Sequence, residues 1–125
     1  PYKKVAVLGD GKLGLIIALA LNASGLDILL VGKHEEKLEI AKNQGVKTIL
    51  LNNLKIEKAY DYVVEATGSI SGFETSLALT KPRGTLILKK STDNLIEELF
   101  DWEPTVVIVE EKEVKKQSKN KSDKE

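Results

Sequence analysis

Three glycines near the start of the chain, Gly9, Gly11 and Gly14, have the spacing G-x-G-x-x-G. An apolar run over residues 5–8 precedes them, and an apolar segment with helical spacing follows. In such a strand–turn–helix unit the first glycine permits the sharp turn, the second lets a pyrophosphate approach the backbone, and the third lets the helix pack closely on the strand. The start of the helix adds free N–H groups and the positive end of its dipole. The spacing therefore predicts a dinucleotide-binding loop; the alternative is that the glycines serve the turn alone.

The end of the second apolar strand, about 20 residues after the glycines, distinguishes the nicotinamide dinucleotides, because an acid there binds the ribose 2′-OH of NAD. This chain has Gly32 at that position, followed by Lys33 and His34. A glycine makes room for a 2′-phosphate, and the two basic residues can neutralise it. We therefore predict NADP(H) in preference to NAD(H). Glu35 and Glu36 keep NAD(H) as the alternative, since either carboxylate could bind a 2′-OH.

A second turn, Ala66-Thr67-Gly68, ends another apolar strand and is predicted to contact the nicotinamide half of the dinucleotide. Its alternative is a plain strand-to-helix turn. The predicted cofactor-binding residues are Gly9, Asp10, Gly11, Lys12, Leu13, Gly14, Gly32, Lys33, His34, Ala66, Thr67 and Gly68. No metal site is predicted, because the chain has no cysteine and one histidine, and no residue is assigned a catalytic role. Disulfides, cysteine-ligated zinc and a histidine metal cluster are excluded within this chain.

Apolar runs alternate with helical patterns along the chain. The predicted strands cover residues 5–8, 27–31, 46–51, 61–65, 85–89 and 105–109, the helices cover 12–23, 33–42, 71–80 and 93–102, and a turn covers 81–84. This alternation is typical of an α/β, doubly wound parallel sheet, the Rossmann fold. We predict six strands in the order 3-2-1-4-5-6, which brings residues 9–14 and 66–68 together at the switch point.

The helix over residues 12–23 is apolar on nearly all sides. Such a helix is either central in the domain or meets a surface that this chain does not supply. Residues 1–110 are predicted to form the dinucleotide-binding domain. Residues 111–125 are strongly charged and are predicted to be a solvated or disordered tail.

The chain has 125 residues, the size of one domain, and equal numbers of basic and acidic residues, 19 each. Bulk charge therefore points to neither a nucleic-acid nor a membrane partner. No apolar run approaches the roughly 20 residues that span a bilayer, so a cytoplasmic protein is expected. The chain begins at Pro1 and lacks methionine, which suggests a piece of a longer protein. The apolar strand over 105–109 predicts a homodimer formed through that edge.

Three stretches, VAVLGDGKLG, LLVGKHEEKLEIAKNQGV and DYVVEATGSISGFETSLALTKPRGTLILK, carry a resemblance over about residues 3–90. They resemble the nucleotide-binding domain of the medium-chain, zinc-type alcohol dehydrogenase superfamily. The three glycines match the pyrophosphate loop of that family, residues 32–34 are similar to its NADP-preferring members, and Thr67 and Gly68 match its turn near the nicotinamide. The resemblance implies an oxidoreductase whose catalytic zinc lies in a separate domain that is missing here. This chain would then bind and orient the cofactor without catalysing hydride transfer alone.

Other functions remain open for a chain with this fold. The main alternative is a stand-alone nucleotide-sensing or interaction module without catalysis. A Rossmann-like domain that has lost its ligand is a third reading. Ligand-gating domains of potassium transport systems and methyltransferases rank lower, because the former lack the second half of the pattern and the latter normally need an acid where Gly32 stands.

Overall fold

The structure, a computed structural model, describes residues 3–89 and 105–109 of the chain. Strands and helices alternate in it: β1 (Lys4–Leu8), α1 (Lys12–Ala23), β2 (Asp27–Gly32), α2 (Glu35–Lys42), β3 (Lys47–Leu50), the 3₁₀ turn η1 (Leu51–Asn53), β4 (Tyr60–Glu65), α3 (Ile70–Leu79), β5 (Thr80–Lys89) and β6 (Thr105–Val109). The predicted helix over 93–102 and the predicted tail over 111–125 lie outside the described residues.

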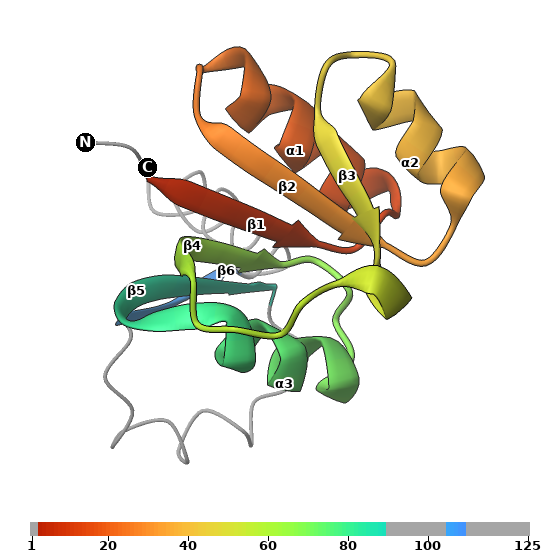
Figure 1. Cartoon of the computed structure of the whole chain (residues 1–125). Helices are drawn as coiled ribbons and strands as arrows, with labels where there is room; N and C mark the ends of the chain where they lie inside the picture. The colour runs from red at the N-terminus through yellow and green to blue at the C-terminus, as the bar shows by residue number, and fades with distance from the viewer. Residues whose placement is uncertain (1–2, 90–104, 110–125) are drawn as a thin grey trace, which may run out of the picture.

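The six strands form one parallel sheet in the order β3-β2-β1-β4-β5-β6. This confirms the predicted fold class and strand order. At the switch point, β1 lies between β2 and β4, with Leu8 paired to Val31 on one side and to Glu65 on the other. The loops that follow these three strands therefore leave the sheet side by side, at the same edge (Figure 1).

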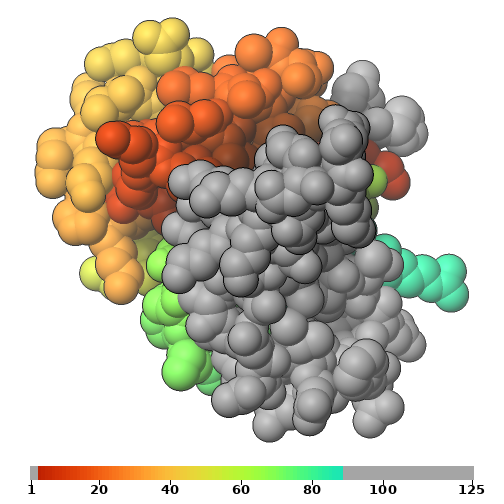
Figure 2. All heavy atoms as spheres, turned by 180° about the vertical axis from the view of Figure 1, so that it is seen from behind, coloured from red at the N-terminus to blue at the C-terminus, as the bar shows by residue number. Residues whose placement is uncertain are grey.

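Helices cover both faces of the sheet. α1 and α2 pack on one face and α3 on the other (Figure 1). Val5 and Val7 of β1 belong to the core beneath α1 and α2, while Ala6 and Leu8 belong to the core beneath α3. Seen from behind, the segments from β1 to β3, red to yellow, lie above the green segments that follow them in the chain (Figure 2). Because both faces are buried, the strands are apolar without polar alternation.

α1 is a surface helix, so the expectation of a central position is wrong. Only Gly14 and Ala18 in this helix are buried, and the side chain of Ile16 is 58% exposed. Small residues at the contact let the helix lie close to the sheet, while its larger side chains are partly exposed. The alternative, that the helix meets a surface which this chain does not supply, agrees with this placement. No helix in the described part of the chain is long and apolar enough to cross a membrane.

The predicted turn over residues 81–84 lies inside β5 instead of before it. β5 begins by pairing Thr80 with Tyr60, and the next pair joins Thr85 to Tyr62. Four residues of β5 therefore stand opposite a single residue of β4, an irregularity that takes up the extra length. Proline has no N–H to donate to a neighbouring strand. It is tolerated here because the residues of the bulge are not paired with β4.

Candidate functional site

A cleft of about 350 Å³ opens at the edge of the sheet where β1, β2 and β4 end. Residues from the β1–α1 turn, the end of β2 and the turn after β4 line it, and Leu51 of η1 closes one side. The predicted site residues that line the cleft are Gly9, Asp10, Gly11, Gly32, Lys33, Ala66 and Thr67. Those that do not are Lys12, Leu13, Gly14, His34 and Gly68. The cleft thus brings together both loops of the switch point.

Two of the three glycines have roles within the protein. Gly9 has φ +118°, which L side chains rarely adopt, and a Cβ there would lie 3.1 Å from the carbonyl carbon of Ala66. A Cβ on Gly14 would overlap the carbonyl oxygen of Gly9, so the start of α1 packs directly on the turn. The sharp bend and the close helix packing predicted for these positions are both present.

Gly11 has no such role within the described structure. Its φ of −73° suits any residue, and a Cβ there would meet no heavy atom within 4 Å. It is the N-cap of α1, with no side-chain cap bond, and it lines the cleft. Open space above a helix N-terminus is what an approaching pyrophosphate requires, because the first N–H groups of a helix have no partner within it.

Asp10 lies between the glycines and has a buried carboxylate, 6% exposed. Its Oδ2 accepts hydrogen bonds from the backbone N–H groups of Lys33, at 2.9 Å, and His34, at 2.7 Å. The His34 Nδ1 lies 3.2 Å from each carboxylate oxygen. Burial raises the pKa of Asp10, but the hydrogen bonds and charge of His34 outweigh it, so the pKa lies below its usual value. The carboxylate is therefore ionised at neutral pH and holds the β2–α2 loop.

The space left by the missing side chain at Gly32 is filled by Asp10. A Cβ on Gly32 would lie 2.5 Å from Asp10 Oδ2 and 2.6 Å from its Cβ. The expectation that Gly32 makes room for a 2′-phosphate is therefore wrong at the position of the glycine itself. A carboxylate does stand at the end of β2, but the glycine loop supplies it and its oxygens face the protein.

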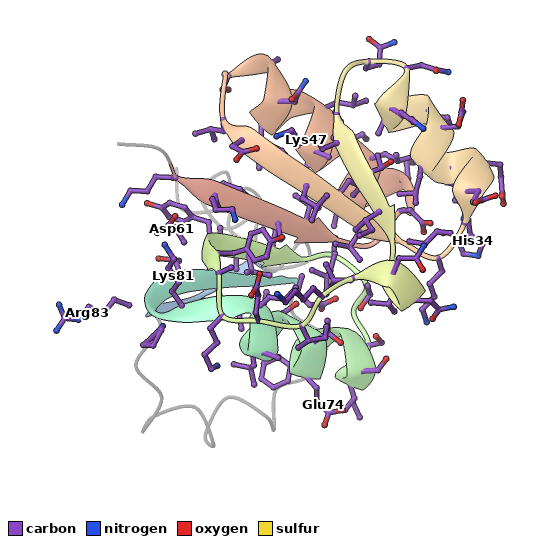
Figure 3. The ribbon with its side chains drawn as sticks, in the orientation of Figure 1. His34, Lys47, Asp61, Glu74, Lys81 and Arg83 are labelled. Atoms are coloured by element: carbon purple, nitrogen blue, oxygen red, sulfur yellow. The ribbon has the colours of Figure 1, made fainter. Side chains whose placement is uncertain are left out.

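Lys33 and His34 flank this carboxylate differently. Lys33 is exposed and lines the cleft, and among the described residues its ammonium has no carboxylate partner. The His34 side chain is 49% exposed and turns Nδ1 toward Asp10, so Nε2 points away from it. His34 lies at the start of α2, on the same edge of the sheet as the cleft (Figure 3). α2 begins at Glu35, two residues later than predicted, because His34 has extended backbone angles (φ −122°, ψ 112°) and is the N-cap of the helix.

The turn after β4 is held by a second buried carboxylate, Glu65, which is 2% exposed. It accepts hydrogen bonds from the N–H of Thr67, at 2.6 Å, from the Thr67 hydroxyl, and from the N–H of Gly68, at 3.2 Å. Ser69 then caps α3 by accepting a bond from the N–H of Gly72, at 3.0 Å. Neither Glu65 nor Ser69 is among the residues predicted for the site. A serine just before an apolar helical segment is a typical N-cap signal and would have identified Ser69.

The described residues do not fit a catalytic zinc. No group of three or more histidine, aspartate and glutamate side chains among them is placed to hold a metal ion. The chain has no cysteine, and its one histidine turns Nδ1 toward Asp10. Any zinc chemistry would need ligands from elsewhere.

A further charged cluster lies at the opposite end of the sheet from His34 (Figure 3). Asp61 accepts a 2.9 Å bond from the backbone N–H of Lys4 and a 3.3 Å bond from the Lys81 ammonium. The bond from Lys4 lowers the pKa of Asp61, and Lys81 lowers it further, against a smaller effect of burial. This cluster joins β1, β4 and β5 at their amino ends and takes no part in the cleft.

Comparisons with known proteins agree with this fold. The family model described as "Zinc-binding dehydrogenase" matches residues 13–116. Glucose 1-dehydrogenase 1 from Picrophilus torridus is 31% identical over 86 residues, which are 66% of this chain and 24% of that protein. L-idonate 5-dehydrogenase from Escherichia coli superposes with a TM-score of 0.71 at 22% identity, over 85% of this chain and 34% of that one. The chain thus spans about a quarter to a third of the length of these relatives.

Two further solved structures hold different dinucleotides. A zinc-binding dehydrogenase from Sinorhizobium meliloti bound to NADP has a TM-score of 0.67 at 18% identity, over 86% of this chain and 37% of that one. Acetophenone reductase from Geotrichum candidum in complex with NAD has a TM-score of 0.62 at 21% identity, over 86% of this chain and 33% of that one. In these two neighbours the same backbone fold accompanies either dinucleotide.

Proposed function

The chain belongs to the zinc-binding dehydrogenase family, and on that premise we propose that it is the NADP(H)-binding domain of an alcohol-dehydrogenase-like oxidoreductase. The observation that carries the proposal is Gly11. Neither its conformation nor any neighbouring atom within 4 Å requires a glycine there, yet it lines the cleft at the start of α1. A pyrophosphate bound at that helix start would explain why position 11 is a glycine.

In this proposal the loops on either side of the cleft bind different parts of the dinucleotide. The pyrophosphate lies over Gly11 and receives hydrogen bonds from the first N–H groups of α1. The ammonium of Lys33 and the imidazolium form of His34 neutralise a ribose 2′-phosphate at the end of β2. Thr67, on the turn after β4, contacts the nicotinamide half. The bound nicotinamide would supply the hydride chemistry, and the residues of this chain bind and orient it.

The preference for NADP(H) depends on the charges beside the end of β2. Lys33 offers an ammonium in the cleft, and Asp10 directs its oxygens into the β2–α2 loop and away from a ribose. An acid side chain at position 32, which would bind a 2′-OH and repel a 2′-phosphate, has no space beside Asp10. These contacts support NADP(H), with NAD(H) as the second candidate.

Hydride transfer by the whole enzyme would need parts that this chain does not supply. In the proposed enzyme a separate domain holds the catalytic zinc and the substrate. The side chain of Ile16 on α1 is exposed. An exposed apolar side chain suits a surface that faces such a domain.

Isothermal titration of the 125-residue chain with NADP⁺ and with NAD⁺ tests the proposal. We expect tighter binding of NADP⁺, and we expect Lys33→Asp to weaken that binding about tenfold or more, since a charged hydrogen bond is worth about 1.5–3 kcal/mol. Lys37→Asp is the matched control, because it makes the same charge change on α2 outside the cleft. Preference for NAD⁺ would reject the cofactor assignment and keep a dinucleotide site; binding of neither would reject the proposed function.

We also propose a homodimer formed through Thr105–Val109. β6 occupies the edge of the sheet among the described strands. An apolar edge strand offers unpaired backbone groups to a second copy. Size-exclusion chromatography with light scattering would show a mass of two chains, and a monomer mass at all micromolar concentrations would reject the dimer.

A further inference from the structure

The carboxylate of Asp10 has a position that the glycine spacing alone does not explain. It sits in the loop predicted to bind pyrophosphate, yet it is buried and faces the β2–α2 loop, 23 and 24 residues further along the chain. A negative charge in a phosphate-binding loop would oppose phosphate binding if it faced the ligand. Its hydrogen bonds show what it does instead.

One oxygen of Asp10 holds the backbone of the loop that carries the two basic residues. Oδ2 accepts from the N–H of Lys33 at 2.9 Å and from the N–H of His34 at 2.7 Å. Bonds from N–H groups to a carboxylate are among the stronger ones in proteins, and here the acceptor is buried. The path of the backbone at residues 33 and 34 is therefore fixed by a side chain from the glycine loop.

The same carboxylate orients the imidazole of His34. Nδ1 lies 3.2 Å from both Asp10 oxygens, so in the neutral ring the proton belongs on Nδ1, where it is donated to Asp10. Nε2, on the other side of the half-exposed ring, then faces away from Asp10. Backbone and ring of His34 are both set by one residue.

Gly32 makes this arrangement possible. A Cβ at position 32 would lie 2.5 Å from Asp10 Oδ2, so a side chain there and the observed Asp10 position exclude one another. Asp10 and Gly32 together thus replace an acid at the end of β2. The carboxylate of Asp10 lies at that place but binds the protein, so the basic residues are the ones that can contact the ribose.

We infer that Asp10 is a positioning residue for dinucleotide selection: it fixes the β2–α2 loop so that the Lys33 ammonium and Nε2 of His34, which carries a proton when the ring is an imidazolium, face the 2′ substituent of the adenosine ribose. This inference rests on the proposed function of the cleft. It assigns Asp10 no contact with the ligand and makes its effect indirect, through the loop that it holds.

The affinities of wild type, Asp10→Asn and Asp10→Ala for NADP⁺ and NAD⁺ test this role. The amide oxygen in Asp10→Asn can accept both backbone bonds, but its NH₂ group cannot accept from a protonated His34, so we expect the preference for NADP⁺ to fall less than in Asp10→Ala. In Asp10→Ala the loop loses its acceptor, and we expect the preference for NADP⁺ to fall about tenfold. Charge alone predicts the opposite, because loss of a carboxylate near a phosphate would tighten NADP⁺ binding.

Tighter or unchanged NADP⁺ binding by Asp10→Ala would overturn the inference. An equal loss of affinity for both dinucleotides would also overturn it, while leaving the proposed function in place. If wild type binds neither dinucleotide, the proposed function fails and the selective role fails with it. The double variant Asp10→Gly with Gly32→Asp, which moves the carboxylate to the end of β2, should prefer NAD⁺; continued preference for NADP⁺ would contradict the inference.

A measurement without ligand checks the contact itself. The chain has one histidine, so its imidazole ¹⁵N signals in the NMR spectrum belong to His34. We expect the Nδ1–H tautomer of the neutral ring in wild type and the Nε2–H tautomer in Asp10→Asn, whose amide can donate to Nδ1. The same tautomer in both proteins would overturn the orienting role of Asp10 even if dinucleotides bind as proposed.

Discussion

Two buried carboxylates, Asp10 and Glu65, hold the two loops that face one another across the cleft, and they differ in how far along the chain they reach. Glu65 binds the backbone of residues two and three positions later. Asp10 binds backbone 23 and 24 positions later, on the neighbouring strand of the sheet. The first turn can form from its own sequence, whereas the second loop takes its shape only when β1 and β2 are paired.

Each carboxylate is matched by a glycine that leaves it space. A Cβ on Gly72 would overlap the Thr67 hydroxyl and lie 2.7 Å from Glu65 Oε1. A Cβ on Gly32 would lie 2.5 Å from Asp10 Oδ2. At both places a glycine leaves space for a buried carboxylate. Glu65 binds within its own turn, whereas Asp10 joins two loops.

The largest effect is expected from Glu65→Ala, which removes the buried acceptor of the local turn. The buried Glu65 carboxylate would lose the bonds from the N–H and hydroxyl of Thr67 and the N–H of Gly68, and we expect the free energy of unfolding to fall by about 3 kcal/mol. Urea denaturation measures it. Glu65→Gln keeps the packing and one acceptor oxygen and should lose less; an equal loss in both variants would show that the ionised carboxylate is required and that side-chain packing contributes little.

Gly32→Ala should cost about 2 kcal/mol of stability, the usual range for forcing extra atoms into a filled space. The reason is the approach of the new Cβ to the Asp10 carboxylate. Asp10→Gly in the same chain frees that space, so thermal and urea unfolding of the single and double variants form a cycle. We expect a clearly non-additive result. Additive losses would mean that the two residues do not compete for one position.

Asp10→Asn should lower stability at pH 7 by about 1 kcal/mol, the difference between a charged and a neutral acceptor. The pKa of Asp10 is lower in the folded protein, so its contribution is fully present above the unfolded pKa of about 3.9 and is lost as pH falls through the folded value. Urea midpoints of wild type and variant should converge below pH 4. A constant difference down to pH 2 would contradict a stabilising ionised carboxylate.

Ser69→Ala should have a similarly small effect, about 1 kcal/mol, because it removes the N-cap bond of α3 from the N–H of Gly72. α2 has no side-chain cap bond at His34, so its start depends on Asp10 instead. Ser69→Thr, which keeps the hydroxyl, is the control. Amide hydrogen exchange should speed up in the first turn of α3 and stay unchanged in α2; faster exchange in both helices would show that the two loops are coupled.

The contrast between the two carboxylates also explains how much the sequence could predict. The glycine spacing and the apolar runs correctly predicted the strand order and the two loops at the switch point, because these signals lie within short stretches. The contact of Asp10 with Lys33 and His34 could not be predicted, since a residue in a turn does not reveal which distant backbone it will bind. The interpretation of Gly32 as room for a ligand was wrong for the same reason: the space belongs to a side chain from another loop.

The start of α2 and the stretch over residues 81–84 show the same limit. The local pattern predicted a helix start at Lys33, but His34 is an extended N-cap beside Asp10, so α2 begins at Glu35. Proline and glycine indicated a turn over residues 81–84, and these residues form an irregular stretch of β5 between the pairs that Thr80 and Thr85 make with β4. In both places the boundary depends on a distant loop or strand that the local pattern does not show.

Gly11→Val tests the central claim of a dinucleotide seated on the start of α1 most directly. A Cβ there meets no protein atom within 4 Å and the φ of −73° suits any residue, so the chain should stay folded, with a small loss of stability because valine is a poorer N-cap than glycine. The same side chain would occupy the space proposed for the pyrophosphate. We predict that calorimetric titration finds NADP⁺ binding to wild type and at least tenfold weaker binding to the variant. Equal binding by both proteins would contradict the account.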